Sequence, residues 1–161
     1  MQLQNNRAQS GQTANGDATM KGSKDLLSSV LKTTQMGQIG IRAVMNAPLR
    51  ASLKTALRSQ LEEYDSIERE AHKLAKLRGW ELEELDPAVK AMATMMTRTQ
   101  LSFGNADSKA AAMMIQGNTR GMIKGLKNLH HYNHSDACVE ALMQKLVDRE
   151  SENIQQMQGF V

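Results

Sequence analysis

Residues 48–78 read PLRASLKTALRSQLEEYDSIEREAHKLAKLR, and this stretch decides the fold class. Apolar side chains return every three or four positions, which is the spacing of one face of an α-helix. Pro48 stands at the first position, where a helix tolerates proline, and Gly79 follows the last turn, where helices commonly end. At 1.5 Å per residue the helix would be about 45 Å long. Its predicted buried stripe consists of Leu53, Leu57, Leu61, Tyr64, Ile67, Ala71, Leu74 and Ala75.

The preceding segment, residues 23–46, predicts a second long helix with the same spacing. Ser23 is the expected N-cap, and Asp25 lies in the first turn, where an acid is favourable. The connection to the next helix is short, so the two helices are expected to be antiparallel neighbours. The stripe of this helix consists of Leu26, Val30, Thr34, Gly37, Ile41 and Val44.

Downstream, a connection of about 28 residues leads to a second helical pair. It contains a predicted short helix over about 87–101, with Asp86 as its cap. Longer helices are predicted over about 108–130, capped by Asp107, and over about 135–158. No segment alternates with period two, so no sheet is expected.

Five glycines interrupt the helices predicted over 23–46 and 108–130. Each costs about 1 kcal/mol relative to alanine in a helix interior. A close approach of these two helices to each other is the expected compensation. The glycines are Gly37, Gly40, Gly117, Gly121 and Gly125.

Composition predicts one domain in a reducing compartment. The chain has 161 residues, 40% of them apolar and only 3% aromatic, and a single cysteine, Cys138. One cysteine allows no disulfide within the chain. The sequence has no run of 18 apolar residues, so no membrane span is predicted, and its N-terminus has no apolar signal region. We therefore expect a cytoplasmic protein, with non-classical export as the alternative, that has a flexible polar tail over residues 1–22 and one domain over 23–161.

The charge pattern does not favour nucleic-acid binding. The net charge is +3, from 20 basic and 17 acidic residues, and the two signs alternate along the helices. Nucleic-acid binding usually needs a concentrated basic face. The weakly basic tail, with Arg7 and Lys21, leaves a DNA-associated function as an alternative.

Two helical hairpins joined by one long crossover describe the ferritin-like arrangement. The segments Ala75-Lys76-Leu77-Arg78-Gly79-Trp80 and Met113-Met114-Ile115-Gln116-Gly117-Asn118-Thr119-Arg120-Gly121 resemble uncharacterised bacterial members of the ferritin-like superfamily. Those members are loosely linked to rubrerythrin-like and spore-coat-like bundles. The resemblance covers about residues 23–159 and implies an all-α, ferritin-like four-helix bundle.

The sequence departs from the di-metal ligand pattern of that fold. Such a site takes one Glu from each of two helices and a Glu-x-x-His pair from each of the other two. The helices predicted over 23–46 and 108–130 contain no glutamate, and no glutamate in the chain is followed by histidine three positions later. A bundle without this cofactor is therefore expected.

Two groups of residues are candidate metal ligands. His130, His134 and Cys138 repeat every four positions, and imidazole with thiolate would suit a transition metal ion. The alternative is a polar turn in which Ser135 or Asp136 caps the last helix. Glu68 and His72 are four apart and could share a helix face.

Several polar residues fall on or near the apolar stripes. They are consistent with the remnant of a ligand site, with a hydrogen-bonded network that fixes helix register, or with edge positions. They are Thr34, Gln38, Asn118, Thr119, Glu150 and Asn153.

These patterns favour a non-catalytic structural or protein-interaction module that forms a homo-oligomer. The sequence contains no GxSxG, Walker or GxGxxG motif. No cofactor and no catalytic residue is predicted, and a membrane or nucleic-acid partner is not expected. The alternatives are a metal-binding protein for redox or storage work with a non-standard site, and a stress-related DNA-associated bundle.

Overall fold

The computed structural model describes residues 6–101 and 104–161, and all regular structure in these ranges is helical. The prediction of an all-α fold without a sheet is confirmed for this part of the chain. The helices are α1 (Asn6–Val44), α2 (Ala51–Arg78), α3 (Pro87–Gln100), α4 (Ala106–His131) and α5 (Ala137–Gln158).

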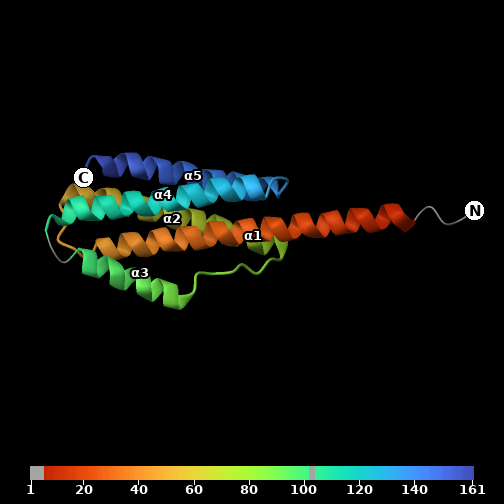
Figure 1. Ribbon diagram of the computed structural model, residues 1–161, viewed down its shortest axis with the longest axis horizontal. Helices are drawn as coiled ribbons and strands as arrows, with labels where there is room; N and C mark the ends of the chain where they lie inside the picture. Colours follow the sequence, from red (N-terminus) through yellow and green to blue (C-terminus); the bar gives the residue numbers. More distant parts are fainter. Residues whose placement is uncertain (1–5, 102–103) are drawn as a thin grey trace, which may run out of the picture.

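The four longer helices lie side by side as two antiparallel pairs (Figure 1). α1 pairs with α2, and α4 pairs with α5. The first residues of α2 and α4 meet at one end, where the Arg50 amide donates to Asp107 Oδ1 at 2.9 Å. At the other end, Arg78 Nε donates to Asp136 Oδ2 at 2.8 Å and ties the end of α2 to the start of α5. α2 and α4 therefore run parallel.

The connection from α2 to α4 runs back along α1. Gly79 ends α2 in the left-handed conformation, with φ of 67°, which glycine adopts without strain. The connection is then held to α1 by two main-chain amides. Glu83 N donates to Ser28 Oγ at 3.2 Å, and Leu85 N donates to Gln35 Oε1 at 3.0 Å. α3 follows and packs on α1.

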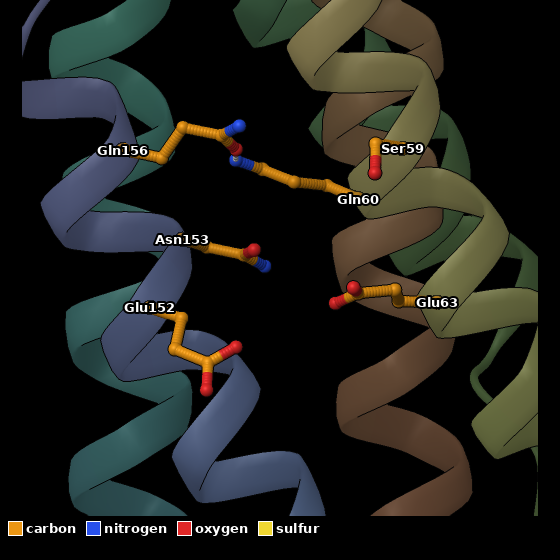
Figure 2. Close-up of a pocket in the computed structure, with 6 residues that line it drawn as sticks. All are labelled: Ser59, Gln60, Glu63, Glu152, Asn153 and Gln156. Atoms are coloured by element: carbon orange, nitrogen blue, oxygen red, sulfur yellow. Dashed lines mark hydrogen bonds between the residues drawn. The ribbon is translucent and has the colours of Figure 1, made fainter.

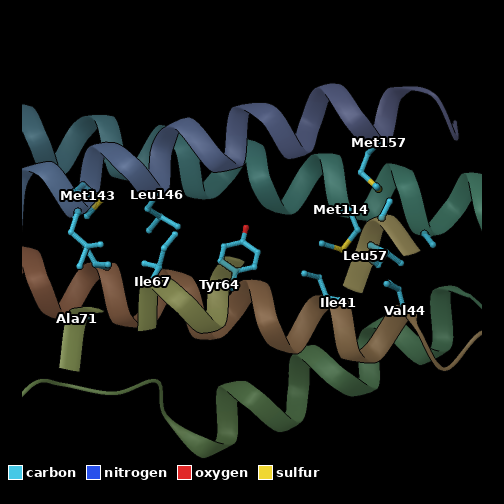
Figure 3. Packing of buried hydrophobic residues seen from close by; sticks show 14 of the residues in the cluster. Ile41, Val44, Leu57, Tyr64, Ile67, Ala71, Met114, Met143, Leu146 and Met157 are labelled. Atoms are coloured by element: carbon cyan, nitrogen blue, oxygen red, sulfur yellow. The ribbon is translucent and has the colours of Figure 1, made fainter. Parts of the chain in front are cut away.

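The core forms where the apolar stripes of α1, α2, α4 and α5 meet (Figure 3). Burying a leucine or isoleucine side chain stabilises the folded state by about 1.5–3 kcal/mol, so these buried side chains are the main source of stability. Its most deeply buried members include Leu26, Leu27, Ile41, Leu53, Leu57, Ile67, Met143, Leu146 and Met157.

The predicted start of the first helix at Ser23 is wrong. α1 begins at Asn6 and extends beyond the ends of the other helices (Figure 1). Ser23 lies inside the helix, where its hydroxyl donates to the Thr19 carbonyl and accepts from the Asp136 amide at 2.8 Å. Side chains 15–21 are exposed and Ser23 is buried, so packing starts at the predicted position although the helix does not. Residues 1–5 of the expected tail lie outside the described residues.

Two of the predicted helix starts also need correction. α2 begins at Ala51 rather than Pro48, and Asn105 rather than Asp107 caps α4 by accepting from the Ser108 amide at 3.3 Å. Asp107 instead pairs with Arg50.

Two capping predictions are confirmed. Asp86 accepts from the Ala88 amide at 2.7 Å. Asp136 accepts from the amides of Cys138 and Val139 at 2.9 and 3.4 Å.

Candidate functional site

A layer of buried polar side chains crosses the core between α2, α4 and α5. It consists of Tyr64 from α2, Asn118 from α4, and Glu150 and Asn153 from α5. Each lies on an inward-facing position, and each is at most 4% exposed. Helical spacing places Glu150 and Asn153 on the same face of α5, because residues three apart are neighbours on a helix.

Tyr64, Asn118 and Asn153 are joined by hydrogen bonds. Tyr64 Oη donates to Asn118 Oδ1 at 2.8 Å, and Asn153 Nδ2 donates to the same oxygen at 3.3 Å. Asn118 Nδ2 donates to the Met114 carbonyl at 2.7 Å. Burial raises the pKa of Tyr64, and the neighbouring Glu150 adds to this effect. The phenol therefore remains a neutral donor at physiological pH.

Glu150 has fewer partners than the rest of the layer. It lies against Gly121 of α4, where a Cβ atom would come within 2.1 Å of Glu150 Oε1. Its Oε2 atom has no hydrogen-bond partner in the part of the chain that the structure describes. Burial raises the pKa of Glu150 to about 8, because an isolated charge is costly in a low-dielectric interior. Glu150 is therefore mainly protonated at neutral pH.

A small groove opens between α2 and α5 beside this layer (Figure 2). Its volume is about 210 Å³, below the roughly 300–1,000 Å³ of ordinary small-molecule sites. Gln60 and Gln156 point toward each other across it, and Gln60 Nε2 donates to Gln156 Oε1 at 2.7 Å. The other lining residues are Ser59, Glu63, Glu152 and Asn153.

One ionic contact joins α2 and α5 beside the same groove. Arg149 lies 3.6 Å from Glu63 Oε2 and also pairs with Glu152, so the two acids already share a cation from this chain. Size and charge together make the groove a poor fit for an organic substrate.

The predicted ligand group His130, His134 and Cys138 is not gathered into a site. All three side chains are exposed. Within residues 6–101 and 104–161, no three His, Cys, Asp or Glu side chains lie close enough together to hold a metal ion. His134 has a positive φ of 77°, which marks a tight turn between α4 and α5. The alternative interpretation, a polar turn capped by Asp136, matches this geometry.

Glu68 and His72 do share a face of α2, as expected. His72 Nε2 lies 3.8 Å from Glu68 Oε1. Glu68 also accepts from Gln38 Nε2 at 2.7 Å and from Gln35 Nε2 at 3.3 Å. Partial burial opposes ionisation of Glu68, but the two amide donors outweigh it and lower the pKa of this carboxyl. The pair has no third ligand in the described residues.

Of the polar positions singled out in the sequence, Asn118 and Asn153 belong to a hydrogen-bonded network. Thr34 is buried, and its hydroxyl has no partner among the described residues, while Thr119 donates to the Ile115 carbonyl. The sequence did not predict Tyr64 as a member of the polar network. Its ring fits the apolar stripe, so the residue was expected only as a core residue, although its hydroxyl is polar.

The expected close approach between α1 and α4 at the glycines is wrong. Three of the glycines, Gly37, Gly121 and Gly125, instead admit side chains from the partner helix of the same pair. A Cβ at Gly37 would lie 2.6 Å from the Tyr64 ring, and one at Gly125 would lie 2.5 Å from Val147. Within residues 6–101 and 104–161, Gly40 and Gly117 have no such neighbour within 4 Å.

No protein-family model, no curated protein and no solved structure matches this chain. Among the described residues, no helix combines the length and apolar character that crossing a bilayer requires.

Proposed function

We propose that this chain is a ferritin-like four-helix bundle that acts as a non-catalytic structural or protein-interaction module and associates with copies of itself. The observation that carries the proposal is the polar layer, in which Tyr64, Asn118 and Asn153 satisfy one another. The hydrogen-bonded network fixes how the helices pack, which supports a structural role for this layer.

The order of the helices supports the ferritin-like part of the proposal. In that arrangement two antiparallel hairpins are joined by one long crossover, so that the second and third long helices run parallel. Here α2 and α4 run parallel, and the connection with α3 runs back along α1 between them. Glu150 and Asn153 have the spacing of a Glu-x-x-His pair, with asparagine at the position that histidine has in that motif.

The residues of the layer do not fit a pair of metal ions. Glu150 is the only carboxylate among them, and its environment favours the protonated form, which is a poor ligand. Gly121 occupies the facing position on α4 and supplies no donor atom. We therefore assign no redox or storage chemistry to this layer.

The interaction part of the proposal is supported by apolar side chains on the surface of α3. Val89 and Met92 are 41% and 63% exposed. Methionine is adaptable in shape and is common at protein-binding surfaces. Large exposed apolar groups close together often mark a contact with another protein.

Sedimentation velocity of the untagged chain over a range of concentrations tests this proposal. The chain mass is 17.8 kDa. We expect species whose masses are multiples of this value and whose fraction rises with protein concentration. A single 17.8 kDa species at every concentration would rule out self-association.

One observation favours a metal-binding protein as the second candidate, namely the Glu68–His72 pair at 3.8 Å. Calorimetric titration with Zn²⁺ distinguishes this metal-binding candidate from the structural or interaction module proposed above. Binding near one ion per chain that is lost in His72→Ala would favour the metal-binding alternative.

A further inference from the structure

α4 presents a basic surface that has no partner among the described residues. Arg120, Lys124 and Lys127 are all exposed, and their spacing places them on one face of the helix. None of them forms an ion pair within the described part of the chain. The only acidic residue of α4 is Asp107, at its first turn. We call Arg120, Lys124 and Lys127 the basic face of α4.

Apolar side chains lie beside these cations. Ile123 is 45% exposed and Leu126 is 49% exposed, and both alternate with the basic residues along the helix. Mixed apolar and basic surfaces favour a partner that offers both acidic and apolar groups. α2 also carries exposed cations at Arg69 and Lys73, but these stand among the acids of residues 62–70.

The chain carries a surface of the opposite charge on its crossover. Glu81, Glu83, Glu84 and Asp86 are exposed, with the half-buried Leu82 and Leu85 between them. Glu83 pairs with Lys32 of α1, and Asp86 caps α3. Glu81 and Glu84 have no partner among the described residues. We call residues 81–86 the acidic crossover.

The two surfaces lie at the same level on different sides of α1. Ser28 Oγ accepts from the Glu83 amide of the crossover, while Ser29 Oγ accepts from Asn128 of α4 at 2.6 Å. In Figure 1 the crossover runs below α1 and α4 lies above it. Because α1 separates them, the acidic crossover and the basic face cannot neutralise each other within one chain.

We propose that the acidic crossover of one copy of this chain docks on the basic face of α4 of a second copy. We choose a second copy as the partner because the acidic crossover of the same chain carries the charge opposite to the basic face, together with the apolar Leu82 and Leu85. The contact joins two different surfaces, so it is head-to-tail and can repeat from one copy to the next. This inference rests on the self-association proposed above and specifies the surfaces that produce it.

Paired charge reversals test the contact, with sedimentation velocity at low salt as the readout. K124E/K127E gives the α4 surface a net charge of −1, and E81K/E84K replaces the two unpaired acids of the crossover with cations. For each variant alone, the dissociation constant for self-association is expected to rise roughly tenfold or more over the wild type, because like charges then face each other. An equimolar mixture of the two variants is expected to associate like the wild type, since each supplies the surface that the other needs.

Two further variants serve as controls. The four substitutions combined in one chain restore opposite charges and are expected to restore association. K73E/K76E reverses two exposed cations of α2 and is expected to leave association unchanged.

The possible outcomes separate the two proposals. If the wild type associates but both reversals leave association unchanged, the docking surfaces are wrong and self-association stands. If the wild type is monomeric at every concentration, both proposals fail. If the wild type instead binds anionic vesicles or DNA and K124E/K127E abolishes that binding without changing association, the basic face serves a different partner and the inference is overturned.

Discussion

Glu150 is the residue whose chemistry departs most from its surroundings. It is 2% exposed, one of its oxygens has no partner among the described residues, and its pKa of about 8 lies well above the ordinary 4.5. The unfolded chain loses this proton near the ordinary pKa, and the folded chain keeps it until about pH 8. The folded state therefore binds more protons between these values, and stability must fall as pH rises through this window.

Glu150→Gln should remove that pH dependence, because the amide is neutral at every pH and similar in shape. Near pH 5 the variant and the wild type should have comparable free energies of unfolding. By pH 8 and above, the variant should be more stable by roughly 4–5 kcal/mol, from the size of the pKa shift. Urea unfolding measured across this pH range checks the difference.

Glu62→Gln, at an exposed glutamate of α2, is the control and should follow the wild-type pH profile. A constant difference between Glu150→Gln and the wild type across the range would contradict the protonated state of Glu150.

At the scale of the helices, α1 and α2 pack closely because Gly37 leaves room for the Tyr64 ring. A methyl group at Gly37 would meet ring atoms at 2.6 Å, and the ring is held in place by its bond to Asn118. Gly37→Ala should therefore destabilise the protein by about 1–3 kcal/mol. The change in the urea midpoint measures this cost.

Gly40→Ala is the matched control, one turn along the same helix. It meets no atom within 4 Å, so it should stabilise the protein by about 0.5–1 kcal/mol through helix propensity. Equal destabilisation by both substitutions would show that the contact with Tyr64 does not determine the packing.

The start of α5 depends on Asp136, which caps two amides and also binds Arg78 of α2. Asp136→Ala should cost about 1–2 kcal/mol, the usual value for a lost N-cap. Asp136→Asn keeps a capping oxygen and should cost less. Thermal unfolding of the two variants separates the cap from the ion pair, and equal losses would assign the effect to Arg78 instead.

The helical elements could be predicted from the sequence because apolar spacing, glycine and proline mark them directly. The start of α1 could not, since residues 6–22 have no apolar stripe, and apolar spacing is the signal that predicts a helix. The role of the glycines was also mispredicted. A glycine inside a helix indicates that another part of the chain packs closely against the helix at that position. Only the arrangement of the helices shows whether that part is a neighbouring backbone or a side chain such as Tyr64.

At the scale of the whole molecule, the sequence could name polar residues on the apolar stripes but could not choose among three interpretations. That choice depends on which side chains meet across helices, as Tyr64 and Asn118 do from positions 54 residues apart. The same limit applies to His130, His134 and Cys138, whose regular spacing predicts one face only if the helix is continuous through them. The turn at His134 breaks that continuity.

The central claim is that the core is closed by its own polar network and holds no metal ions. Elemental analysis of the native, untagged protein tests it most directly. The account predicts iron, manganese, zinc and copper far below one ion per chain. One or two bound ions per chain that are lost in Glu150→Gln would contradict it.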